Sequence, residues 1–95
     1  MYSKHLNFTG HAIRQMFQRK ITKDDVRKVI NHGEVISDYP DDNPLPSMLI
    51  LGFVEKRPLH VVLAYDTINE TGYVVTAYVP DAKLWTENFK RRIQA

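Results

Sequence analysis

The spacing of the apolar residues changes at Gly33, and this change most constrains how the chain can fold. Before Gly33, apolar residues recur at helical spacing. After it, short apolar runs alternate with loops rich in Pro, Asp and Asn. A chain of 95 residues that changes period once predicts a single α+β domain over residues 1–95, with helices first and strands afterwards.

Two helices are predicted before this change, over residues 9–20 and 22–32. Thr9 is placed to cap the first helix through its side-chain oxygen. Thr22 and Asp25, three positions apart, form an acidic variant of the capping box at the start of the second. The connection between the helices is very short, so we expect them to pack as a hairpin or a sharp corner.

Strands are predicted after Gly33, joined by short loops that favour antiparallel neighbours. The four expected strands are residues 34–39, 47–54, 59–65 and 73–79. Asp81 is placed to cap a last short helix or turn over residues 81–93, with Leu84, Trp85 and Phe89 available to pack back on the domain. The expected fold is therefore α+β, with two N-terminal helices packed on a four-stranded antiparallel meander sheet and a short C-terminal helix.

Composition excludes several classes of protein. The chain has no cysteine, so it holds neither a disulfide nor a cysteine-based zinc site. Hydrophobic residues make up 43% and charged residues 25%, which is the composition of a folded domain rather than a disordered chain. No apolar run approaches the ~18 residues of a membrane-spanning helix. The N-terminal stretch lacks the apolar core of a signal peptide, so we expect a cytoplasmic protein.

Charge is unevenly distributed along the chain. Residues 1–33 carry a net charge of +5, residues 34–80 carry −5, and residues 81–95 carry +2. Two basic ends that met in space would form a phosphate-binding surface. Solvated helix faces would give the same charge pattern, so charge alone leaves both interpretations open.

A histidine lies inside the otherwise apolar strand "LHVVLAY". Because side chains alternate along a strand, the face that carries this histidine is His60, Val62 and Ala64. By the same alternation, one face of the fourth strand carries Val74, Thr76 and Tyr78.

The hairpin between these strands decides which residues meet. A symmetric 66–72 loop pairs Tyr65 with Tyr73. Val62 then faces Thr76, and His60 faces Tyr78 across the ladder. The pair is either a catalytic or ligand-binding group on an open sheet face, or a structural cross-strand contact. The sequence leaves both open.

Three motifs carry a resemblance to a known family. They are His-Ala-x-Arg at 11–14, Arg-Pro-Leu-His-Val-Val at 57–62, and Val-Thr-x-Tyr-x-Pro at 75–80 with Trp85 following. From Phe8 to Arg92, the chain resembles the bacterial domain-of-unknown-function family 4258. That resemblance implies the toxin half of a type II toxin–antitoxin operon, with a zinc-finger antitoxin of the kind that partners the MqsR toxin. The element order also resembles the RelE, BrnT and MqsR toxins, which are small metal-independent endoribonucleases.

Metal-independent cleavage of RNA proceeds by attack of the ribose 2′-OH on the adjacent phosphorus. It needs a base, an acid and positive charge on the phosphoryl oxygens. His60 is the natural base or acid, with Tyr78 as its partner. His11 and Arg14, one helical turn apart, would supply a second imidazole and a phosphate clamp, and Thr76 shares the face of Tyr78.

Further residues are candidates for holding RNA. The expected phosphate contacts are Arg19, Lys20, Lys90, Arg91 and Arg92. Tyr39 and Trp85 are candidates for stacking on bases, with core packing as the alternative for Trp85. Arg14 is otherwise a solvated helix residue or an ion-pair partner of Asp38. We expect no cofactor and no metal. The expected partners are mRNA, free or on the ribosome, and a cognate antitoxin.

A second function fits the same residues. A non-catalytic protein- or RNA-binding module of the same fold would need neither the base nor the acid. The mild net charge of +2 and the acidic middle of the chain favour this alternative over a strongly basic RNA-binding enzyme.

Overall fold

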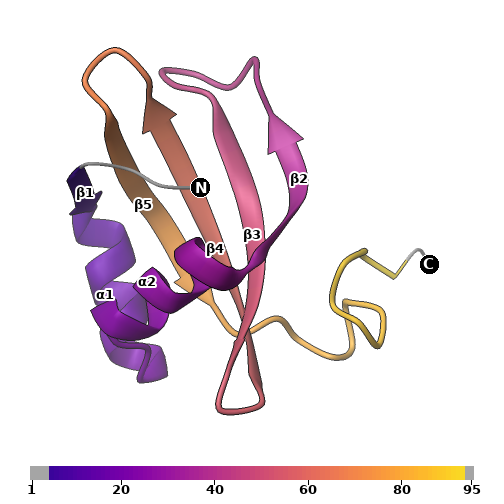
Figure 1. The fold of residues 1–95 in the computed structure, drawn as a ribbon. Helices are drawn as coiled ribbons and strands as arrows, with labels where there is room; N and C mark the ends of the chain where they lie inside the picture. Colours follow the sequence, from indigo (N-terminus) through magenta and orange to yellow (C-terminus); the bar gives the residue numbers. More distant parts are fainter. Residues whose placement is uncertain (1–4, 94–95) are drawn as a thin grey trace.

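The computed structural model describes residues 5–93. Residues 1–4, part of the stretch assessed for a signal peptide, and residues 94–95 lie outside this range. The elements are β1 (His5–Phe8), α1 (Gly10–Arg19), α2 (Lys23–His32), β2 (Glu34–Tyr39), β3 (Ser47–Val54), β4 (Arg57–Asp66) and β5 (Thr71–Tyr78). The strands form one five-stranded sheet in the order β1-β5-β4-β3-β2, and both helices pack on one of its faces (Figure 1).

Both helices lie where the sequence predicts them, with the predicted caps. The Thr9 side chain accepts a hydrogen bond from the Ala12 amide at 3.1 Å. The capping box of α2 is complete, because the Thr22 and Asp25 side chains each accept the other residue's amide at 3.0 Å. Each helix has 10 residues, and within residues 5–93 neither is long and apolar enough to cross a membrane.

The predicted four-stranded antiparallel meander, and with it the RelE-like architecture, is wrong. His5–Phe8 forms a fifth strand, which pairs in parallel with the start of β5. A four-residue segment with two apolar side chains is too short for alternation to give a usable signal. Its pairing also joins the two ends of the domain, a long-range contact that local sequence does not encode.

The predicted C-terminal helix is wrong as well. Residues 81–93 form turns and one isolated bridge between Trp85 and Arg92. Asp81 does act as a cap, but of a turn, where its side chain accepts the Lys83 amide at 2.8 Å. Phe89 has a φ of 61°, in the left-handed region that a right-handed helix cannot include. Figure 1 shows this segment running from the end of β5 toward the side of the sheet where β2 lies.

The core lies between the helices and one face of the sheet. Leu59, Val61 and Leu63 of β4 are fully buried there, against apolar side chains of both helices. Helix α2 approaches β3 closely at Gly52, where a side chain would meet the helix directly. In the part of the chain that the structure describes, no helix covers the opposite face of the sheet, which we call the helix-free face.

Gly52→Ala is expected to lower the free energy of unfolding by about 2 kcal/mol, because overpacking forces α2 away from β3. A Cβ at this position would lie 2.9 Å from Val29 Cγ2 and 3.1 Å from Val29 Cα. Urea denaturation of Gly52→Ala, Val29→Ala and the double variant checks the cause. If the clash is responsible, the free energy of unfolding falls less in the double variant than the sum of the decreases in the two single variants. Additive losses would contradict it.

The β4–β5 hairpin brings His60 opposite Tyr78 and Val62 opposite Thr76, as predicted. Its turn end differs, because the register shifts after Val62 and Tyr65 pairs with Gly72 rather than Tyr73. This shift is a β-bulge in which Val75 is the extra residue.

The bulge also corrects the predicted face of β5. Val74 does not share the face of Thr76 and Tyr78. It pairs with Leu63 and is fully buried in the core under the helices. Side chains on the two sides of the bulge therefore alternate out of step, which a strict period-two assignment cannot anticipate.

Candidate functional site

His60 lies on the face of the sheet opposite the helices, yet it is fully buried, with 0% of its surface exposed. Residues 81–93 cover it from this side. The Trp85 ring lies edge-on to the imidazole with ring centroids 4.3 Å apart. Phe89 packs against Phe53 of β3 with centroids 6.4 Å apart. A ligand bound to this arrangement therefore cannot touch His60 itself.

Both ring nitrogens of His60 have partners, and these partners define the tautomer. Nε2 lies 2.8 Å from the Phe89 carbonyl oxygen, which only accepts hydrogen bonds, so Nε2 carries a proton and donates it. Burial lowers the pKa of His60 below its usual 6.5, against a smaller opposite effect of the Phe89 carbonyl, and so favours the neutral ring. In the neutral ring Nδ1 is the acceptor, and the Tyr78 hydroxyl, 3.2 Å away, donates to it.

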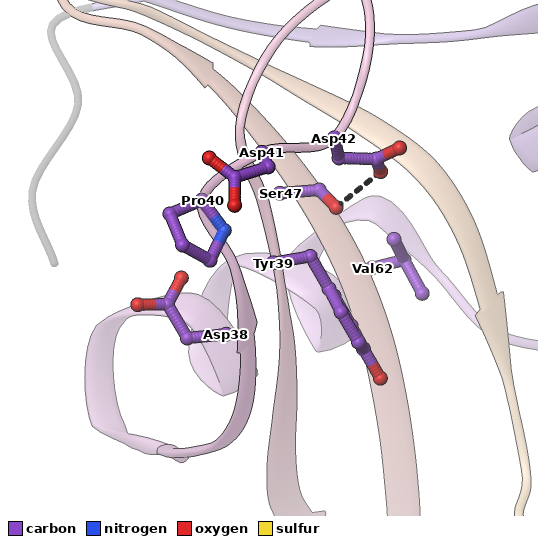
Figure 2. A pocket seen from close by; sticks show the side chains of 7 residues that line it. All are labelled: Asp38, Tyr39, Pro40, Asp41, Asp42, Ser47 and Val62. Carbon is purple, nitrogen blue, oxygen red and sulfur yellow. Dashed lines mark hydrogen bonds between the residues drawn. The ribbon is translucent and has the colours of Figure 1, made fainter.

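The Tyr78 side chain is half-buried, and its burial and two neighbouring residues affect the pKa of its hydroxyl. Burial raises the pKa of Tyr78, the Tyr39 hydroxyl raises it further, and the charge of Arg92 acts in the opposite direction. Tyr39 and Arg92 therefore lie within electrostatic range of the Tyr78 hydroxyl. In Figure 2, the Tyr39 ring extends from its strand over the sheet.

A groove of about 870 Å³ runs between β2 and the C-terminal segment. We call it the basic groove and define it by Tyr39, Trp85, Lys90, Arg91 and Arg92, which are among the residues lining it. Glu34, the one carboxylate among the described residues that line the groove, pairs with Lys90 at 3.1 Å. Two arginines remain uncompensated, so the groove attracts anions.

Lys90, Arg91 and Arg92 of the predicted RNA-binding residues line the basic groove. Arg19 and Lys20 do not line it. They are exposed at the end of α1, where their backbone carbonyls accept hydrogen bonds from the Arg57 guanidinium at 3.4 and 3.2 Å. The two basic ends of the chain therefore contribute to different parts of the surface.

The structure brings two of the five predicted catalytic residues into contact with each other. His60 and Tyr78 are in contact, whereas the Thr76 hydroxyl donates to the Gln15 side chain of α1. His11 and Arg14 are exposed on α1 and, within residues 5–93, make no side-chain hydrogen bond or ion pair, including the one considered between Arg14 and Asp38. No group of three His, Asp or Glu side chains in the same range is arranged to hold a metal ion.

Sequence reasoning missed two features of the site. Tyr39 entered only as a stacking residue, and its position near Tyr78 depends on β2 lying at the sheet edge and on the direction of its ring. The cover formed by Trp85 and Phe89 depends on a turn-rich segment that folds back on β4 and has no periodic signal. The sequence predicted that Trp85 and Phe89 pack back on the domain, but not that they cover His60.

The burial of His60 predicts a dependence of stability on pH. Above about pH 6.5 the ring is neutral in both states. Below this value the unfolded chain binds a proton that the folded protein takes up only at lower pH, so the free energy of unfolding falls. We expect the free energy of unfolding to fall between neutral pH and about pH 5, and to fall less over the same range in His60→Gln. Urea denaturation across this range checks it, and equal pH dependence in both proteins would contradict the assignment.

The fold and the site define a small α+β domain with a mixed five-stranded sheet and a covered histidine–tyrosine pair on its helix-free face. A comparison with protein families matches residues 8–79 to a domain of unknown function, DUF4258. The chain therefore belongs to the DUF4258 family. The matched range includes both helices and the His60–Tyr78 pair, and it ends before the segment that covers them. Comparisons with curated proteins and with solved structures find no match.

Proposed function

We propose that this protein is a cytoplasmic, metal-independent endoribonuclease that binds mRNA in the basic groove and acts as the toxin of a type II toxin–antitoxin pair. The observation that supports this proposal best is the position of Tyr78. Its hydroxyl is hydrogen-bonded to His60, whose burial lowers the pKa of the ring, and it lies within electrostatic range of Arg92 and Tyr39, which line a groove rich in cations.

The groove offers the two contacts that single-stranded RNA requires. Lys90, Arg91 and Arg92 provide positive charge for successive phosphates. Tyr39, which is 48% exposed, provides a ring on which a base can stack. Trp85 is buried against His60, so its role in this proposal is packing rather than stacking.

The proposed chemistry uses Tyr78 as the residue that touches RNA and His60 as the positioning residue behind it. The ribose 2′-OH gives its proton to the Tyr78 oxygen while the Tyr78 proton passes to His60 Nδ1. The Phe89 carbonyl, which accepts from Nε2, stabilises the imidazolium that forms. The 2′-oxygen bonds to phosphorus, giving a 2′,3′-cyclic phosphate. The 5′-oxygen departs and takes a proton from solvent, and Arg92 offsets the charge on the phosphoryl oxygens.

The complete burial of His60 favours a second candidate function. With both ring nitrogens occupied and Trp85 against the ring, the histidine has the surroundings of a structural residue. The protein would then be a non-catalytic RNA-binding module that uses the same groove. The two candidates differ only in whether bound RNA is cut.

Incubation of the purified protein with mRNA in the presence of EDTA, with and without ribosomes, tests the proposal. We expect cleavage that leaves 2′,3′-cyclic phosphate ends. Tyr78→Phe removes the proton relay and should slow cleavage by about 100-fold while RNA binding is kept. Expression of the wild type should arrest growth, and expression of Tyr78→Phe should not. RNA that stays bound but intact under both conditions would favour the non-catalytic module.

The toxin assignment also requires a cognate antitoxin, for which the resemblance suggests a zinc-finger protein. Co-expression with the product of the neighbouring gene tests this part separately. Relief of growth arrest together with co-purification would support it. Growth arrest that no neighbouring gene relieves would leave the ribonuclease proposal in place and remove the antitoxin.

A further inference from the structure

The C-terminal segment, residues 81–93, is folded on itself. Its two halves meet at the Trp85–Arg92 bridge, where the Thr86 amide donates to the Arg91 carbonyl at 2.9 Å. In the described part of the chain, all of its backbone–backbone hydrogen bonds lie within the segment, and no strand of the sheet pairs with it. The segment can therefore move as one piece about its connection to β5, without breaking the ladder of the sheet.

Within residues 5–93, two polar bonds hold this segment against the helix-free face of the sheet. His60 Nε2 donates to the Phe89 carbonyl at 2.8 Å, and Lys90 pairs with Glu34 of β2 at 3.1 Å. The ion pair is open to solvent, since 42% of the Lys90 side chain and 60% of the Glu34 side chain are exposed, so its contribution is small. The bond from the buried imidazole is therefore the main polar attachment of the segment.

The helices and the sheet have a core that does not include this segment. The described apolar cluster between the helices and the sheet contains no residue from 81–93. Trp85 is buried on the other face of the sheet, where its ring lies against His60. The match to the DUF4258 family also ends at residue 79, before the segment begins. Opening of the segment would therefore expose His60 and leave the core in place.

The closed segment opposes protonation of His60. The imidazole is fully buried, and the Trp85 ring lies against it. The Arg92 guanidinium lies 5.7 Å from the centre of the same Trp85 ring, so a positive charge is already close. Protonated Nδ1 would have to donate a hydrogen bond, and the Tyr78 hydroxyl would have to turn round to accept it. An imidazole that reaches water is free of these costs.

The other ionisable groups near His60 do not offset these costs. Leu51 of β3 pairs with His60 on one side and with Glu34 on the other. Glu34 therefore lies two strands away from His60, at about 10 Å between backbones, and its carboxylate is paired with Lys90. Tyr78, on the opposite side, brings no negative charge at neutral pH, because burial raises its pKa. No carboxylate in the described range is bonded to the imidazole.

We propose that the C-terminal segment is a hinged cover that opens when His60 is protonated, while the helices and the sheet stay folded. Burial lowers the pKa of His60 below its usual 6.5, so the closed state loses stability as the pH falls from about 6.5 toward 5. Opening takes the basic groove apart, because Lys90, Arg91 and Arg92 all belong to the segment. Acid therefore removes an anion-binding groove. The inference does not rest on RNA cleavage, since it concerns only the position of the segment.

Thiol labelling tests whether the segment opens by itself, because the chain has no cysteine of its own. Leu51→Cys places a thiol between Glu34 and His60, in the row of the sheet that the segment contacts. Val61→Cys places one in the core under the helices and reports global unfolding. The rate of reaction with a dipyridyl disulfide, divided by the rate of the urea-unfolded variant at the same pH, gives the open fraction. Leu51→Cys should react at least about tenfold faster than Val61→Cys. Equal rates would overturn the inference, because opening would then require global unfolding.

The pH dependence of the same labelling tests the role of His60. The open fraction of Leu51→Cys should rise about tenfold between pH 7.5 and pH 5. Adding His60→Gln, whose amide can still donate to the Phe89 carbonyl but takes up no proton, should limit the rise to less than about twofold. Adding Glu34→Gln instead removes the exposed ion pair and should leave the tenfold rise in place. A rise of less than twofold with His60 present, an equal rise with His60→Gln, or loss of the rise with Glu34→Gln would overturn the inference.

Discussion

Replacing His60 with alanine is expected to lower the free energy of unfolding by about 3 kcal/mol. The imidazole is fully buried, so its removal leaves a cavity under Trp85. It also leaves the Tyr78 hydroxyl and the Phe89 carbonyl without their shared partner. Urea denaturation at neutral pH measures the loss. Hydrogen exchange should show faster opening of residues 81–93, because His60 holds this segment against the sheet.

His11→Ala is the matched control, because His11 is an exposed histidine with no side-chain hydrogen bond in the part of the chain that the structure describes. It should change the free energy of unfolding by less than about 0.5 kcal/mol. A similarly small loss in His60→Ala would contradict the cover over the histidine. A large loss has a consequence for function, since inactivity of His60→Ala alone cannot then identify a catalytic group. Tyr78→Phe, which keeps the ring and its packing, is the more informative variant.

Removing the three cations of the basic groove is expected to weaken RNA binding by about 100-fold at low salt. The variant combines Lys90→Ala, Arg91→Ala and Arg92→Ala, the three residues placed to neutralise phosphates. Each lost contact with single-stranded RNA removes about 0.7 from the slope of log affinity against log salt concentration, so the slope should fall by about 2. Fluorescence anisotropy with a labelled oligonucleotide at several salt concentrations measures both quantities.

The control for this variant combines Lys23→Ala, Arg27→Ala and Lys28→Ala on α2. It removes the same charge from the face of the molecule that carries the helices. Its affinity for RNA should stay within about threefold of the wild type, because only unspecific attraction is reduced. An equal loss in both variants would mean that net charge, rather than the groove, determines binding.

The sequence correctly predicted that His60 pairs with Tyr78, although the loop pairing from which this was derived is wrong. The symmetric loop paired Tyr65 with Tyr73, whereas the structure pairs Tyr65 with Gly72 and restores the predicted register with the bulge at Val75. Because the bulge lies between the loop and the pair, alternation remained valid at His60 and Tyr78. Between the bulge and the loop, simple alternation gives the wrong face, because the side chain of Val74 is buried in the core.

Local patterns predicted the elements that local chemistry determines. The capping box of Thr22 and Asp25 and the apolar runs of β2 and β3 gave correct positions. The strand His5–Phe8 and the C-terminal segment depend on contacts between distant parts of the chain. For this reason the sequence could suggest His60 and Tyr78 as a pair, but it could not show that Phe89 and Trp85 cover them.

The most direct test of this account maps where RNA binds. ¹⁵N-labelled protein is titrated with a single-stranded oligonucleotide that carries 2′-O-methyl groups, which removes the attacking hydroxyl and prevents cleavage. We expect amide shifts in residues 34–37, 39, 85–86 and 90–93, which line the basic groove, and at Tyr78, which lies within electrostatic range of Tyr39 and Arg92. Shifts confined to α1 and α2, or to the loop at residues 40–46, would contradict this binding site.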